Sequence, residues 1–386
     1  MTRVTVNESV FRWAIERSGL TRGNLQQKFP KLPQWETGEK LPTLHQLEVF
    51  ARATATPLGY LFLSDPPEER LSIPHFRTLG GEPAGRPGPD LLETVQFMER
   101  RQAWMREFQI EQGQEPLAFV KSARRAAAPR AVAEQMRQRL GLAGGWAAER
   151  GTWTDALRHL RTAMEEAGIL VVVNGIVGNN THRKLDPTEF RGFVLVDNYA
   201  PLVFVNGADG KAAQMFTLAH ELAHIWFGSS AAFDLRQLQP ANDPTELACN
   251  AVAAEFLVPE VELREAWPTL RRAPDLFDAI ARQFKVSRLV AARRALDLQL
   301  ISRDEFLEFY QAYQAEEVRS AEQQSDGGDF YASQNLRISR RFGEAVVRAA
   351  REGRLLYQEA YKLTGIHGKT FDRYAGMLGF EGRRGQ

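Results

Sequence analysis

The sequence predicts an α+β protein that is mainly helical and divided into several domains. Three observations support this class. Apolar residues recur at three- and four-residue spacing over most of the chain, three short β-branched runs lie between residues 169 and 205, and the length of 386 residues exceeds that of a typical single domain. With 44% apolar and 25% charged residues, the composition is that of an ordinary globular protein.

Residues 1–79 are predicted to form a small helical module. Its turn Trp35-Glu-Thr-Gly38 and its helix start Pro42-Thr43 resemble the Xre-type helix-turn-helix. Only five residues, Pro30 to Gln34, separate Phe29 from Trp35, which is too short and too rich in proline for a full turn plus a recognition helix. We therefore classify the module as degenerate, and both DNA contact and a docking or dimerisation role remain open for it.

Residues 80–150 are predicted to be a linker followed by a helical segment. The stretch from Gly80 to Pro89 is rich in glycine and proline, as linkers are. After it, the spacing of apolar residues predicts one helix from Leu91 to about Ile110 and another over 129–140.

The segment 151–270 is predicted to be a peptidase core that contains a small sheet. A helix from Trp153 to Gly168 comes first. Three β-branched runs bounded by turn residues follow and predict strands over 169–173, 193–196 and 202–205. An edge strand of such a sheet can pair with an extended peptide through backbone hydrogen bonds.

The motif His220-Glu221-Leu-Ala-His224 carries the strongest functional signal. Two residues four apart on a helix differ by about 400° of rotation and so lie about 40° apart on one face. Both imidazoles can therefore bind one ion, and Glu221 is placed to act as a general base on water at that ion. Helical spacing from Met215 to Trp226 supports the helix, with Asp209 expected as its cap and Gly228 as its end.

A second helix is predicted to start at Asp243-Pro244 and to end before Pro259. Glu246 and Asn250 share one face of it, so Glu246 can supply a third metal ligand while Asn250 orients a ligating histidine. The spacing Asp243-x-x-Glu246 also fits a capping box, in which Glu246 would only bind the helix start. We expect Glu255, on the opposite face, to be a surface or salt-bridge residue.

Together, Phe216-Thr-Leu-Ala-His-Glu-Leu-Ala-His224 and Glu246-Leu-Ala-Cys-Asn250 resemble the ImmA/IrrE family of metallo-endopeptidases over roughly residues 150–300. The resemblance implies a zincin-like core of a small β-sheet and two zinc-site helices. It also implies His220, His224 and Glu246 as Zn²⁺ ligands and Glu221 as the general base. Manganese or another divalent ion suits the same ligands. The expected substrate is a helix-turn-helix transcriptional repressor, whose cleavage relieves silencing after stress.

Two further segments complete the chain. Residues 271–322 contain a second helix-turn-helix pattern, and residues 271–303 hold eight Lys or Arg against three Asp or Glu, which makes DNA contact or repressor binding conceivable there. After a linker at residues 323–329, residues 323–386 are expected to form a small C-terminal helical domain.

Composition limits the location and the partners. The single cysteine, Cys249, cannot form an internal disulfide, and the first twenty residues include five charged side chains, so we expect a cytoplasmic protein without a signal peptide. No apolar run is long enough for a membrane span. A net charge of +1 argues against a globally basic nucleic-acid binder.

Alternatives to a zinc endopeptidase remain at this point, and a protein that both binds and cleaves one transcriptional complex is also open. In the first, the chain is a DNA-binding regulator or an antitoxin-like partner of a toxin, with the peptidase fold as a scaffold. In the second, the metal only stabilises the fold, which predicts four protein ligands and no open position. A regulator should bind DNA with a steep salt dependence, whereas a protease should destroy its target only when metal is present.

Overall fold

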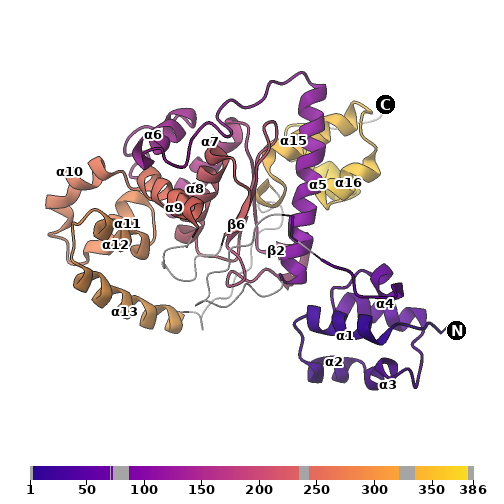
Figure 1. Cartoon of the computed structure of the whole chain (residues 1–386). Helices are drawn as coiled ribbons and strands as arrows, with labels where there is room; N and C mark the ends of the chain where they lie inside the picture. Colours follow the sequence, from indigo (N-terminus) through magenta and orange to yellow (C-terminus); the bar gives the residue numbers. More distant parts are fainter. Residues whose placement is uncertain (1–2, 70, 73–86, 234–242, 321–334, 381–386) are drawn as a thin grey trace. The chain divides into compact units, whose positions relative to one another are not determined.

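A computed structural model describes residues 3–69, 71–72, 87–233, 243–320 and 335–380. The protein is mainly helical with a small sheet, which confirms the α+β class (Figure 1). Contacts divide the chain into two units, one made of residues 1–72 and 85–96 and the other of the remaining residues. The linkers expected at 80–89 and 323–329 lie largely or wholly outside the described residues. No helix in the described ranges is both long and apolar enough to cross a lipid bilayer.

The first unit contains short helices around its own apolar core. They are α1 (Glu8–Arg17), α2 (Arg22–Lys28), α3 (Leu32–Glu36), α4 (Leu44–Ala53) and the 3₁₀ helix η1 (Leu58–Phe62). Side chains cap three of the starts, and Thr43 forms a full capping box with Gln46. The segment before Trp35 does form a helix, but α3 has only five residues. As the sequence predicts, this segment is too short to form a full-length recognition helix.

The sheet of the second unit has the strand order β1-β5-β4-β6. Its strands are β1 (Leu170–Asn174), β4 (Gly192–Leu195), β5 (Leu202–Asn206) and β6 (Ala231–Phe233). β1 pairs with β5 in parallel, while β4 pairs antiparallel with both β5 and β6. Every residue of β1, β4 and β5 is buried, because helices cover both faces of the sheet. A separate ribbon joins β2 (Ile176–Val177) to β3 (Asn180–Lys184).

Helices on both faces fix the sheet (Figure 1). On one side lie α8 (Lys211–Phe227) and α9 (Pro244–Leu257), and on the other lies the part of α5 (Pro89–Glu111) that follows residue 97. Gln102 of α5 donates to the carbonyls of Leu195 and Ala200 at 2.7 and 3.0 Å. The remaining helices near this core are α6 (Pro129–Arg139), α7 (Trp153–Glu166), α10 (Glu260–Leu270), α11 (Leu276–Phe284), α12 (Arg288–Asp297) and α13 (Arg303–Ser320).

The second helix-turn-helix pattern corresponds to α11 and α12. Lys285 takes a left-handed conformation after α11, and Ser287 caps α12 by accepting from Val290 N, as the sequence predicts. However, half of α12 is buried, including Arg294, and Asp297 is its one exposed residue. α12 therefore packs as part of the core and offers little surface for a DNA groove.

The described part of the C-terminal segment, where the sequence predicts a small helical domain, contains three helices that pack on one another. Its helices are α15 (Arg340–Arg351), α16 (Tyr357–Thr364) and α17 (Lys369–Met377). Phe342, Phe371 and Tyr374 are among its fully buried side chains. Ser339 Oγ and Arg340 N donate to Glu165 of α7 at 2.6 and 2.9 Å, which attaches this domain to the core.

Candidate metal centre

α8 carries the two histidines of the motif. Its residues from Gln214 to Trp226 are all buried, and Gly228 ends the helix in the left-handed conformation with φ 76°. The prediction of Asp209 as the N-cap is wrong by one residue, because Gly210 is the N-cap. Asp209 instead forms an ion pair with Arg191, with 3.3 Å between Oδ2 and the guanidinium nitrogen. Four-residue spacing puts both imidazoles on one face, and the Nε2 atoms of His220 and His224 lie 3.0 Å apart.

α9 brings the third side chain to this point. Asp243 caps the helix by accepting from the backbone amides of Thr245 and Glu246 at 2.7 and 3.2 Å, and Pro244 is its first residue. The Glu246 carboxylate does not reach back to the helix start. Instead, Oε2 lies 3.1 Å from His220 Nε2 and Oε1 lies 3.2 Å from His224 Nε2. The capping-box role is therefore excluded for the Glu246 side chain.

The geometry of these three residues suits a divalent cation. A tetrahedral ion with bonds of about 2.1 Å separates neighbouring ligand atoms by about 3.4 Å. The two Nε2 atoms lie 3.0 Å apart, slightly below that value, and each of them has one oxygen of the Glu246 carboxylate at 3.1 or 3.2 Å. All three side chains are buried, and two imidazoles with one carboxylate form a ligand set that zinc takes in catalytic sites. The close approach of the two Nε2 atoms is explained if both bind the same ion.

The protonation states also favour metal binding, which needs neutral imidazoles and an ionised carboxylate. Burial lowers the pKa of His220 to about 4. Burial alone would raise the pKa of Glu246, but its contacts with His220 and His224 hold that pKa well below the usual range. Asn250 Oδ1 lies 3.0 Å from His220 Nδ1 and accepts its proton, which leaves the lone pair on Nε2.

Glu221 lies beside this cluster and is fully buried. Neither of its carboxylate oxygens has a hydrogen-bond partner within the described part of the chain. Burial, followed by the charge of Glu246, raises the pKa of Glu221 well above its ordinary value. A carboxylate with raised proton affinity and unused acceptor atoms is suited to take a proton from a bound water.

Gly192 of β4 shapes the wall next to Glu221. A Cβ atom at this position would lie 3.4 Å from Glu221 Oε1, and only 2.6 Å from Thr217 Cγ2 and 2.8 Å from the Phe204 carbonyl oxygen. Only glycine therefore allows the strand to approach α8 this closely. Sequence reasoning did not single out Gly192, although a glycine that opens an otherwise apolar strand is a signal of such an approach.

Two other residues of α9 have structural roles. Cys249 is buried, and burial raises the pKa of its thiol well above the ordinary value. Glu255 is a buried salt-bridge residue that pairs with Arg294, so the surface alternative for it is wrong.

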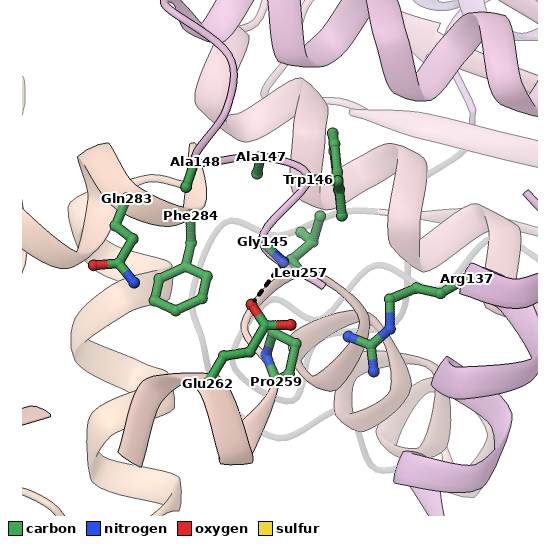
Figure 2. Close-up of a pocket in the computed structure, with 10 residues that line it drawn as sticks. All are labelled: Arg137, Gly145, Trp146, Ala147, Ala148, Leu257, Pro259, Glu262, Gln283 and Phe284. Carbon is green, nitrogen blue, oxygen red and sulfur yellow. Dashed lines mark hydrogen bonds between the residues drawn. The ribbon is translucent and has the colours of Figure 1, made fainter. Parts of the chain in front are cut away.

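A small pocket lies at the far end of α9 and does not include the metal cluster (Figure 2). Arg137, Trp146, Pro259, Glu262 and Phe284 are among its lining residues. Glu262 accepts from Gly145 N at 3.2 Å, and Arg137 donates to the carbonyls of Glu255 and Phe256 at 3.3 Å each. The Arg137 contacts hold the last turn of α9, while Glu262 of α10 holds the loop at Gly145.

Comparison with known proteins agrees with this geometry. Residues 338–377 match a domain family of unknown function, DUF8813. No curated protein and no solved structure matches the chain. Residues 164–296, from the end of α7 through α12, match the peptidase family M78, described as the IrrE N-terminal-like domain. This segment, which contains the His220, His224 and Glu246 cluster, is therefore similar to the metallopeptidase domain of ImmA/IrrE proteins.

Proposed function

We propose that this protein is a zinc-dependent endopeptidase that cleaves a helix-turn-helix transcriptional repressor. The observation that carries the peptidase assignment is the convergence of three buried side chains. His220 Nε2 and His224 Nε2 lie 3.0 Å apart, the two oxygens of the Glu246 carboxylate lie 3.1 and 3.2 Å from them, and Glu221 is buried beside this cluster. The repressor as substrate rests on the similarity to IrrE-like domains and to the motifs of that family.

When bound, the cation would lower the pKa of water and polarise the scissile carbonyl. His220 and His224 would hold it through Nε2, and Glu246 through its carboxylate. Among the residues that the structure describes, three side chains form this ligand cluster. Three protein ligands would leave a position for solvent, which supports a catalytic rather than a purely structural metal.

Glu221 would act as the general base. Its carboxylate takes a proton from the attacking water and later gives it to the leaving amine. Its burial supports this role, because the raised pKa lets the carboxyl group hold the proton between the two steps. Asn250 keeps the His220 ring in the required tautomer through the Nδ1 contact.

The sheet supports the binding of an extended peptide. β6 ends the strand order, and among the described strands only β4 pairs with it. β4 also carries Gly192, next to the Glu221 carboxylate. Gly192 pairs with Phe233 of β6, so a peptide added to the β6 edge would be separated by one strand from the strand that contacts Glu221.

The experiment compares new protein N-termini in cells that express the parental chain or the Glu221→Gln chain. We expect a cleavage in a helix-turn-helix repressor that appears only with the parental chain, while both chains retain equal metal by elemental analysis. Glu134→Gln serves as the matched control, because Glu134 is exposed on α6 and forms an exposed ion pair with Arg130. Cleavage of the same repressor at the parental rate by Glu221→Gln, or in the presence of a chelator, would contradict the mechanism.

A further inference from the structure

The C-terminal domain has features that the peptidase function leaves unexplained. Its helices α15, α16 and α17 share a compact core in which Phe371 and Tyr374 of α17 are buried. Tyr361 of α16 packs edge-on against Phe371, with ring centres 5.3 Å apart. Gly343 of α15 admits the Tyr374 ring, because a Cβ there would lie 2.2 Å from the Tyr374 hydroxyl. These contacts fix α17 against the other two helices.

The connection between α16 and α17 is that of a helix-turn-helix. It spans four residues, from Gly365 to Gly368. Gly365 closes α16 in the left-handed conformation with φ 74°, and its amide donates to Tyr361 O at 2.8 Å. Ile366, the next residue, is buried. A short glycine-containing turn with one inward apolar residue is typical of DNA-binding helix pairs, whose second helix enters the major groove.

The outer face of α17 is exposed and carries cations near the helix start. Lys369 and Arg373 lie one turn apart and are both exposed, with Asp372 and Gly376 beside them. The domain as a whole is basic, since residues 335–380 hold nine Lys or Arg and four Asp or Glu, whereas the full chain has a net charge of only +1. The outer face thus carries two cations and one carboxylate on a domain whose overall charge is positive, a sign that suits the DNA backbone.

Gly376 is a second, independent observation on the same face. It sits inside α17, where glycine weakens a helix, and a Cβ at this position would meet no atom within 4 Å. Packing within the protein therefore does not require a glycine here. A missing side chain on an exposed helix face lets another molecule approach the backbone closely.

The two other helix-turn-helix-like segments lack such a face. α12 has Asp297 as its one exposed residue, and α3 has only five residues. α17 has nine residues, and its outer side chains stay exposed while Arg101 donates to the carbonyls of Leu363 and Thr364 at 2.9 and 3.3 Å. The contacts that hold the domain on the core thus leave α17 accessible.

We propose that the C-terminal domain binds duplex DNA, with α17 in the major groove. Lys369 and Arg373 face the bases or the adjacent phosphates, and Gly376 allows the helix backbone to approach the groove wall. The inference goes beyond proteolysis and does not depend on the metal site. It would place the peptidase on DNA, where a repressor substrate is also found.

The test measures binding of the full chain to a fluorescent 30-base-pair duplex of random sequence, by anisotropy at several NaCl concentrations. The parental chain should bind with an affinity that falls steeply with salt. Lys369→Glu with Arg373→Glu should weaken binding at least tenfold and make the slope of log affinity against log salt shallower by about 2, because each lost phosphate contact removes about 0.9. Lys369→Arg with Arg373→Lys should bind as the parental chain does.

The control pair Arg130→Glu with Arg158→Glu makes the same change in net charge at two exposed positions of α6 and α7 and should leave the slope unchanged. Gly376→Leu should weaken binding without lowering the thermal midpoint, because leucine is the better helix former. The proposal is overturned if the parental chain does not bind the duplex, as expected for a protein-docking face. It is also overturned if the α17 charge variant keeps the parental slope, or if Gly376→Leu binds like the parental chain.

Discussion

Arg294 of α12 and Glu255 of α9 form a buried ion pair that links the helix-turn-helix-like segment to the helix that carries Glu246. Arg294 Nε also donates to the Val258 carbonyl at 2.9 Å, next to the end of α9. Burial lowers the pKa of Arg294 to about 10, because the charged guanidinium loses part of its hydration. Arg294, one of the eight basic residues in 271–303, is thus a buried side chain that holds α9 in place.

Replacing Glu255 with alanine should destabilise the peptidase core by about 3–5 kcal/mol, because the Arg294 charge would be left buried and unpaired. Replacing both residues, as Glu255→Leu with Arg294→Met, should restore most of the loss. The measurement is the thermal midpoint of the core transition. Arg130→Ala, which breaks an exposed pair of the same type, should change it little. Equal midpoints for Glu255→Ala and the parental chain would show that the pair does not hold α9.

Cys249 offers a second readout of the same helix, since it is the single thiol of the chain and is fully buried. Burial raises its pKa, so the folded protein should hardly react with a disulfide reagent at pH 8, whereas the unfolded chain should react at once. A control chain with Cys249→Ser and Glu134→Cys should react rapidly when folded. Fast reaction of Cys249 in the folded parental chain would contradict the packing of α9 described above.

The meeting of His220, His224 and Glu246 could be predicted from the sequence, because helix periodicity and helix-start signals determine where each side chain lies on its helix. The four-residue spacing of His220 and His224 places both on one face, and the Asp243-Pro244 start sets where Glu246 stands on the second helix. The buried pairing of Glu255 with Arg294 could not be predicted, because it depends on how α12 packs against α9, 39 residues along the chain. The same holds for α12 itself, whose arginines suggest a solvated face although its packing buries half of it.

Gly192 shows the limit of sequence reasoning most directly, and it yields a sharp test. Gly192→Ala should destabilise the core by about 1–3 kcal/mol, because the added methyl group would clash with Thr217 Cγ2 and with the Phe204 carbonyl. Thr217→Ser removes one of these two obstacles while keeping the hydroxyl that donates to Ala213 O. The double variant should therefore recover part of the loss in thermal midpoint. If Gly192→Ala is as stable as the parental chain, β4 does not approach α8 as closely as described.

The contact between Asn250 and His220 predicts that a change at Asn250 lowers metal affinity, although Asn250 is not itself a ligand. Asn250→Ala removes the acceptor of the His220 Nδ1 proton, so the ring loses both its tautomer and its orientation, and zinc affinity should fall about 10- to 100-fold. Asn250→Asp keeps an acceptor at the same place and should retain affinity near the parental value. Competition with a chromogenic zinc chelator measures both. His224→Ala should lose far more than Asn250→Ala, because a ligand and not its orienting partner is removed. Equal affinities for Asn250→Ala and the parental chain would mean that the His220 ring is held by α8 packing alone.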